Sequence, residues 1–123
     1  MMGWKSGMTK LVINTCYGGF GLSDEGWRLY AKYKNYCTRE VDNIYLSGVE
    51  VCLDNTFDDL AIIRPYDLVR NDPDLVRVVE ELGVLAGDNY SDLKVIEIPD
   101  DVVWELNDYD GREWISEVHR RWS

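Results

Sequence analysis

The chain has 123 residues, of which 46% are hydrophobic and 29% are charged, so it carries enough apolar side chains for one folded domain. Its 23 Asp and Glu residues outnumber its 13 Lys and Arg residues, and the formal net charge is −10. This balance argues against nucleic-acid binding, because a phosphate backbone is held mainly by many Lys and Arg contacts. Membrane insertion is also unexpected, since no stretch approaches the roughly 18 to 20 apolar residues of a membrane span.

The start of the chain and its cysteines bear on compartment and domain bounds. The first residues lack the apolar segment of a secretory signal, and the three cysteines are widely spaced without a metal-binding pattern. These features predict a cytoplasmic protein with reduced thiols. We expect residues 1–9 to be a flexible or dispensable N-terminus and residues 10–123 to form a single domain.

The first predicted elements flank a glycine-rich loop. Leu11–Ile13 is a β-branched run that indicates a buried strand, and the loop 17–21 that follows contains three glycines. Ser23 is a suitable N-cap, and the apolar and aromatic residues after it recur at helical spacing. The sequence therefore predicts a helix over about 24–33.

Short strands are expected in the middle of the chain. Residues 44–46 and 49–53 resemble the two strands of a hairpin around a Ser-Gly turn. Residues 60–63 add a further predicted strand, which ends before Pro65 because the residue preceding a proline favours an extended conformation.

The clearest helix signal begins at Asp72. This residue supplies a capping carboxylate, and Pro73 suits the first helical position. An amphipathic pattern follows, so we expect a helix over 73–86 with Gly87 as its left-handed stop.

The last part of the chain predicts strand, strand and helix. Residues 93–98 and 102–106 are extended segments, and a turn over 108–111 leads into a last helix. Four apolar residues share one face of that helix: Trp114, Ile115, Val118 and Trp122. The order of elements predicts an α/β or α+β fold, with a single small sheet covered by about three helices.

Four stretches of the sequence carry a family resemblance. They are KLVINTCYGGFGLSDE at 10–25, RNDPDLV and the residues after it at 70–83, KVIEIPDD at 94–101, and the segment 104–120. Together they cover more than half of the chain, and they resemble a family of small hypothetical proteins encoded by bacteriophages and large DNA viruses. The resemblance implies an accessory viral protein acting in the host cytoplasm, and it implies no particular activity.

The glycine loop is the main candidate ligand site. A strand that runs into such a loop and then into a capped helix places backbone amides where they can converge on an anion. Neither a P-loop nor a complete GxGxxG pattern is present, since Asp24 stands where the latter needs its third glycine. A tight structural turn is the alternative explanation of the glycines, because such a turn needs positive φ. The candidate ligand-binding residues are Asn14, Tyr17, Gly18, Gly19, Phe20, Gly21, Ser23, His119 and Arg120.

Other reactive side chains give no catalytic or metal-binding pattern. A phosphatase-type Cys-x5-Arg loop starting at Cys16 would need Arg at position 22, where Leu22 stands, so a structural thiol is expected. His119 is the only histidine. It either complements the end of the last helix or joins Arg120 and Trp122 in contacts with a nucleotide. We therefore assign no catalytic residue, no metal site and no cofactor.

Three functions remain open at this point. The first is non-enzymatic binding of a small anionic, nucleotide-type ligand, with Tyr17 and Phe20 stacking on it, as a means of sequestering a host signal. The second is an acidic protein–protein interaction module or inhibitor of a host protein, suggested by the charge of −10. The third is an enzyme that acts on a nucleotide. The 5 Trp and 8 Tyr residues also predict an interface, most simply a homo-oligomer.

Overall fold

The computed structural model describes residues 7–42 and 47–118, which form seven strands and two α-helices. In chain order the elements are β1 (Met8–Asn14), α1 (Asp24–Lys34), β2 (Cys37–Asp42), β3 (Ser47–Cys52), β4 (Ile62–Ile63), α2 (Pro73–Leu82), β5 (Leu93–Pro99), β6 (Trp104–Tyr109) and β7 (Arg112–Glu117). Two short 3-10 turns, Pro65–Asp67 and Gly83–Leu85, precede and follow α2.

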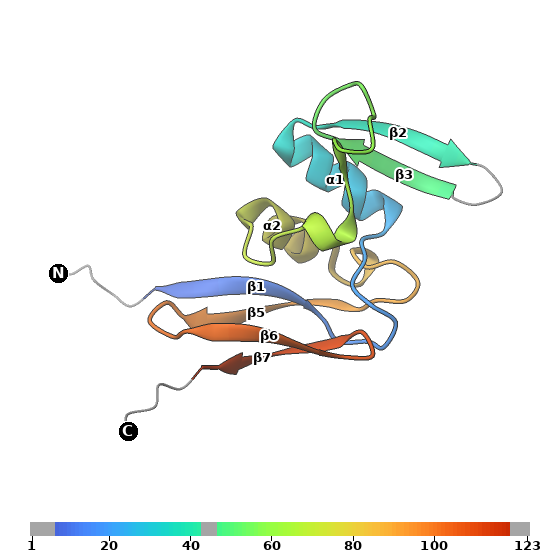
Figure 1. The fold of residues 1–123 in the computed structure, drawn as a ribbon. Coiled ribbons are helices and arrows are strands. Elements are labelled where there is room, and N and C mark those ends of the chain that lie inside the picture. The colour runs from blue at the N-terminus through green and yellow to red at the C-terminus, as the bar shows by residue number, and fades with distance from the viewer. Residues whose placement is uncertain (1–6, 43–46, 119–123) are drawn as a thin grey trace.

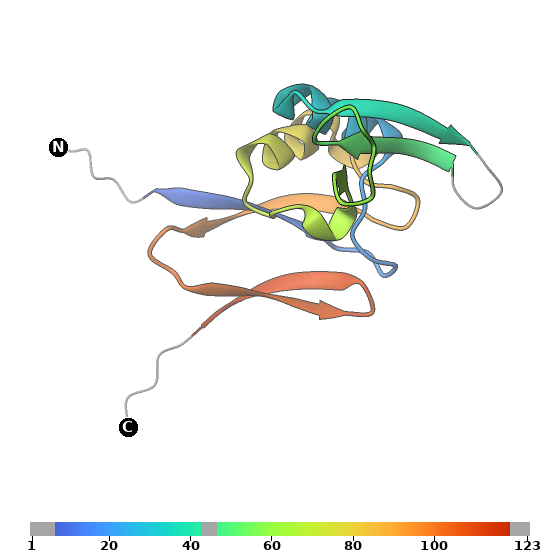
Figure 2. The same cartoon turned by 45° about the horizontal axis from the view of Figure 1, so that its top comes forward.

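The helices form a middle layer with sheets on either side. β1 and β5 pair antiparallel against α2, while β2, β3 and β4 form a second antiparallel sheet against α1 (Figure 1). The third sheet is the β6–β7 hairpin, which lies beyond β1 and β5 on the side away from the helices (Figure 2). The fold class is therefore mixed α/β, as the sequence predicted.

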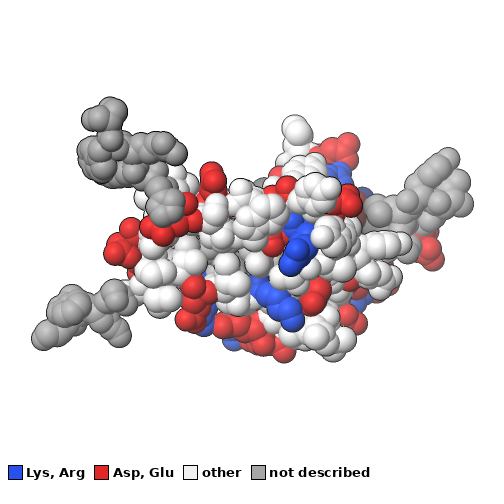
Figure 3. All heavy atoms as spheres, turned by 90° about the horizontal axis from the view of Figure 1, so that it is seen from below, with Lys and Arg blue, Asp and Glu red and all other residues white. Residues whose placement is uncertain are grey.

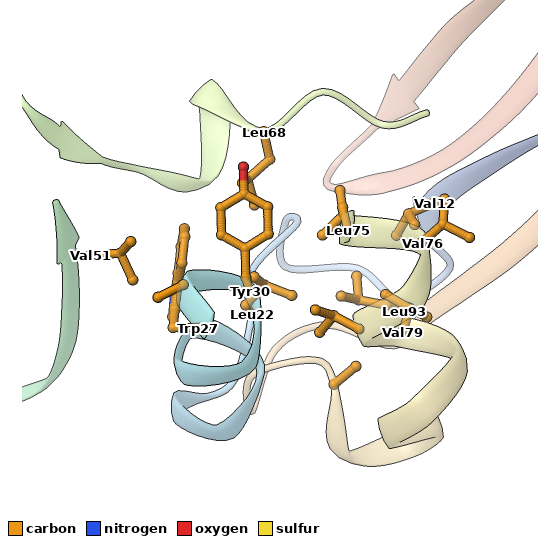
Figure 4. Close-up of a cluster of buried hydrophobic side chains, with 13 residues drawn as sticks. Val12, Leu22, Trp27, Tyr30, Val51, Leu68, Leu75, Val76, Val79 and Leu93 are labelled. Carbon is orange, nitrogen blue, oxygen red and sulfur yellow. The ribbon is translucent and has the colours of Figure 1, made fainter. Parts of the chain in front are cut away.

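The hydrophobic core lies where the two helices meet each other and the two flanking sheets. Trp27 and Tyr30 of α1 pack edge to face with ring centroids 6.2 Å apart, and the fully buried Leu75 of α2 lies beside them (Figure 4). Val12 of β1 and Val51 of β3 close the core from opposite sides. Each such fully buried side chain contributes about 1.5–3 kcal/mol through the hydrophobic effect.

Both helices begin where the sequence predicted. The Ser23 hydroxyl accepts a hydrogen bond from the Gly26 N–H at 3.0 Å, and the Asp72 carboxylate accepts one from the Asp74 N–H at 2.9 Å. Lys34 at the end of α1 forms ion pairs of 2.7 and 3.0 Å with these two aspartates. The end of one helix is thereby tied to the start of the next.

The predictions of a single sheet and of about three helices are wrong. Within the described residues there are three small sheets and two α-helices, and the segment expected to form the last helix is strand β7. Tyr109 pairs with Arg112, and the two residues between them, Asp110 and Gly111, have φ angles of 55° and 90°. Asp-Gly favours this two-residue hairpin loop, because both positions need a positive φ. The turn therefore folds the chain back as a strand.

Two local predictions also need correction. The first hairpin pairs Cys37–Asp42 with Ser47–Cys52, so the expected Ser47-Gly48 turn belongs to β3, while residues 44–46 lie outside the described residues. Helix α2 stops at Gly83, whose φ is 57°, rather than at Gly87, which bridges Leu22. Strand β3 and helix α2 are thus present with shifted ends, whereas β2 was not predicted.

Strand β1 starts earlier than the apolar run suggested. Met8 and Thr9, which we expected to be part of a dispensable segment, pair with Pro99 and Ile98 of β5. The predicted strand at 60–63 is reduced to Ile62 and Ile63. Among the residues that the structure describes, no helix is long and apolar enough to cross a membrane.

Candidate functional site

The glycine loop leads from β1 to α1, and Asn14 holds its first turn. The side chain of Asn14 is fully buried; its Nδ2 donates hydrogen bonds of 2.8 Å to the carbonyls of Cys16 and Gly111. Its Oδ1 accepts hydrogen bonds from the backbone N–H groups of Cys16 and Asp92 at 3.2 and 2.9 Å. The amide of Asn14 is thus engaged by four backbone groups, which gives it a structural role.

The loop packs against the turn of the β6–β7 hairpin. The Gly18 N–H donates to the Asp110 carbonyl at 3.2 Å, and a Cβ on Gly111 would overlap the backbone nitrogen of Gly19. This close approach requires glycine at position 111. It also means that the Gly18 amide, one of the proposed anion donors, already has a protein acceptor.

Phe20 and Tyr17 have different surroundings. The Phe20 ring lies against the guanidinium of Arg70, 3.8 Å from its centre, and Arg70 is paired with the buried carboxylate of Glu113. The Tyr17 side chain is 55% exposed. Of the other predicted ligand contacts, Ser23 caps α1, while His119 and Arg120 lie outside the described residues.

A concave site has Ser23 in its lining. It is a groove of about 580 Å³ between the first turn of α1, strands β3 and β4, and the segment 87–89. Its apolar floor includes the buried side chains of Leu22, Trp27 and Ile62. We refer to it as the α1 groove.

The rim of the α1 groove is acidic. Asp24 and Glu25 are exposed in the first turn of α1. Glu50 lines the groove from β3, and Asp88 lines it from the segment 87–89. Arg64 is the one basic residue among those that line it, and its guanidinium is 3.9 Å from Asp59. Four carboxylates around an apolar floor favour a ligand that combines positive charge with an apolar group.

Two of the four carboxylates are oriented by neighbours. Glu50 pairs with Arg39 across the β2–β3 hairpin at 2.7 Å. Asp88 accepts hydrogen bonds from the Tyr90 N–H at 2.9 Å and from the Ser91 hydroxyl at 3.0 Å. Asp24 and Glu25, by contrast, lie at the positive end of the helix dipole, which stabilises their charges and offsets the attraction of that end for another anion.

Sequence reasoning found only Ser23 among the residues that line the groove. The others come from segments around residues 24, 41, 48, 63 and 88, which are brought together by tertiary contacts such as the 2.8 Å hydrogen bond from the Ser23 N–H to the Ala86 carbonyl. The acidic pair after Ser23 was visible in the sequence, and it was the one signal that pointed to this surface.

No arrangement of metal ligands is present in the part of the chain that the structure describes, where no three His, Cys, Asp or Glu side chains are grouped to hold an ion. A second, smaller hollow of about 490 Å³ lies beside β1, where Lys10 and Glu80 form a 2.7 Å ion pair. Because that pair satisfies both charges, the α1 groove is the stronger candidate for ligand binding.

Comparison with known proteins identifies no relative: no protein-family model, no curated protein and no solved structure matches the chain. The resemblance to small phage and viral proteins therefore stays a prediction.

Proposed function

We propose that the protein is a non-enzymatic interaction module that holds a basic segment of another protein in the α1 groove. The observation that carries this proposal is the lining of the groove, where four carboxylates surround an apolar floor and Arg64 is the one basic lining residue. Glu50 is already paired with Arg39, so Asp24, Glu25 and Asp88 are the carboxylates that would meet a basic partner. A partner segment with Lys or Arg beside an apolar residue would satisfy both parts of the surface. The net charge of −10 would also steer a basic partner toward the protein.

A nucleotide-type ligand, the other binding function predicted above, has less support from the contacts. A phosphate at the start of α1 would meet Asp24 and Glu25, and on the far side the Gly18 amide already donates to Asp110. Inhibition of a host protein, the alternative suggested by the charge of −10, is compatible with capture of a basic segment and remains part of the proposal.

The proposal is tested by titrating fluorescently labelled peptides and measuring anisotropy. One set carries two or three Lys or Arg residues beside a single Leu or Phe, a second set carries Glu in place of the basic residues, and mononucleotides serve as competitors. We expect the basic set to bind and the acidic set not to bind. Affinity should fall as salt is raised, because exposed charge pairs are screened beyond about 10 Å at 0.1 M ionic strength.

A pair of charge reversals shows whether binding occurs in the groove. Glu25→Lys changes the groove rim and should weaken binding by about tenfold, which corresponds to roughly 1.4 kcal/mol. Glu97→Lys makes the same change in net charge at an exposed position of β5, outside the groove, and should leave the affinity within about twofold. Equal weakening by both variants, or binding of nucleotides without binding of basic peptides, would contradict the proposal.

A further inference from the structure

The outer face of the β6–β7 hairpin is an exposed surface that the proposed function does not use. In the register of the hairpin, Glu105 is opposite Ser116, Asn107 is opposite Trp114 and Tyr109 is opposite Arg112. Side-chain hydrogen bonds of 2.8 Å from Asn107 to Ser116 and 3.3 Å from Ser116 to Glu105 show that these residues share one face. The opposite face carries the buried Glu113 and packs toward β1.

This outer face combines exposed apolar side chains with polar ones. Trp114 is 47% exposed and Tyr109 is 70% exposed, and Val103 and Val118 continue the surface at the open end of the hairpin, where the Val118 N–H donates to the Val103 carbonyl. Figure 3 views the molecule from the hairpin side and shows wide uncharged areas between scattered acidic and basic groups. An exposed apolar patch of this kind is typical of an interaction site.

The charges on this face match one another across a two-fold axis. The Asn107–Trp114 row lies between the Glu105–Ser116 row and the Tyr109–Arg112 row. If a second hairpin packs face to face about an axis along the middle row, Trp114 meets its own copy and the two outer rows exchange places. Arg112 of each copy then lies over Ser116 of the other, and because the Ser116 hydroxyl is 3.3 Å from the Glu105 carboxylate, the Arg112 guanidinium can reach that carboxylate. Such self-complementarity is what an isologous interface requires.

We propose that the outer face of the β6–β7 hairpin is the homodimer interface of this protein, with Trp114 at its centre and Arg112 paired with Glu105 of the second copy. A foreign acidic or basic partner would match only one of the two charges, whereas a second copy matches both. Trp at the centre of a patch with charged residues at its rim is also the usual anatomy of a protein–protein interface.

The test is a charge-swap experiment, with mass and dimer Kd measured by sedimentation over a range of concentrations. The unmodified chain should reach twice its 14.3 kDa mass. Arg112→Glu and Glu105→Arg should each raise the dimer Kd by about tenfold or more, because the two-fold axis repeats every repulsive contact. The double variant, which restores opposite charges, should return the Kd to within about threefold of the original.

Two further variants test whether loss of the dimer follows from a change at the interface or from unfolding or an altered net charge. Trp114→Ser should leave a monomer with unchanged far-UV circular dichroism, whereas Lys32→Glu, a charge reversal at an exposed position of α1, should leave the dimer intact. A chain that stays monomeric at all concentrations, or a double variant as weak as the single ones, would overturn the proposal. So would a monomer whose Trp114 becomes accessible to a quencher on removal of residues 119–123, since that result would assign the face to the chain's own C-terminus.

Discussion

Glu113, a buried carboxylate on β7, connects several elements of the fold. Its Oε2 lies 2.7 Å from Nη2 of Arg70, and its Oε1 accepts the Asn14 N–H at 2.8 Å. Arg70 in turn donates to the Val12 carbonyl at 3.3 Å and lies against the Phe20 ring. One carboxylate therefore links β7, the edge of β1 and the segment that precedes α2.

Removing this carboxylate should be more harmful than removing the whole ion pair. We expect Glu113→Ala to lower the free energy of unfolding by about 3–5 kcal/mol, because it leaves the Arg70 guanidinium largely buried without a counter-charge. The double variant Arg70→Met with Glu113→Leu should lose less, since no charge remains buried. Urea unfolding measures both. A loss below about 1 kcal/mol for Glu113→Ala would show that the pair is solvated.

At the scale of elements, Gly111 lets the hairpin turn and the glycine loop touch. Gly111 and Gly83 both have positive φ, 90° and 57°, but only Gly111 has backbone atoms within reach of an added Cβ. Gly83→Ala should therefore cost on the order of 1–3 kcal/mol from backbone strain alone. Gly111→Ala should cost more, because its methyl group would displace the loop at Gly18 and Gly19.

Hydrogen exchange separates these two effects of an added methyl group. The Gly18 N–H donates to the Asp110 carbonyl beside Gly111, so Gly111→Ala should speed exchange of that amide. Gly83→Ala does not touch this contact, so it should change exchange of the Gly18 amide no more than its loss of global stability does. If both variants have the same effect on the Gly18 amide, the contact between loop and hairpin is not what Gly111 provides.

The elements also show how far local sequence signals reach. Both helix starts were predicted, because Ser23 and Asp72 satisfy the backbone N–H groups just after them. The prediction of a last helix is wrong, because the spacing of Trp114, Ile115 and Val118 also fits a strand. The Asp-Gly pair before them favours a hairpin turn. Local capping is visible in the sequence, whereas the choice of strand partner is made by tertiary contacts.

For the molecule as a whole, the same limit applies to the candidate site. The fold class followed from the alternation of elements, but the division into three sheets depends on pairings such as β1 with β5, whose paired residues are 79 to 91 positions apart. The α1 groove is assembled from five separate segments, of which only the one that contains Ser23 carried a local signal. Net charge was predictable, and its concentration at one groove rim was not.

The helical layer between the sheets gives the whole molecule a sensitivity to alkaline pH. Burial raises the pKa of Tyr30 from 10.0 to about 12, and the nearby Asp72 adds to the shift while Lys34 opposes it; the charges of Tyr36 and Asp74 make smaller contributions in the upward direction. The unfolded chain therefore loses this proton near pH 10 while the folded chain keeps it. The contribution of Tyr30 to the free energy of unfolding is fully present below pH 10 and is lost as the pH rises towards 12.

Lys34 acts in the same direction. Hydrogen bonds to Asp72, and to a smaller extent Asp74, raise the pKa of its ammonium group above 10.5, so its stabilising charge is also present below that pH and lost above it. We expect the free energy of unfolding, measured by urea titration, to fall between pH 10 and 12. Tyr30→Phe removes one of the two groups and should make this fall shallower, whereas Tyr90→Phe, at a 70% exposed position, should not. An equally steep fall in the Tyr30→Phe variant would mean that folding does not raise the pKa of Tyr30 in the unmodified protein. Its phenol would then ionise in the folded state as it does in the unfolded chain.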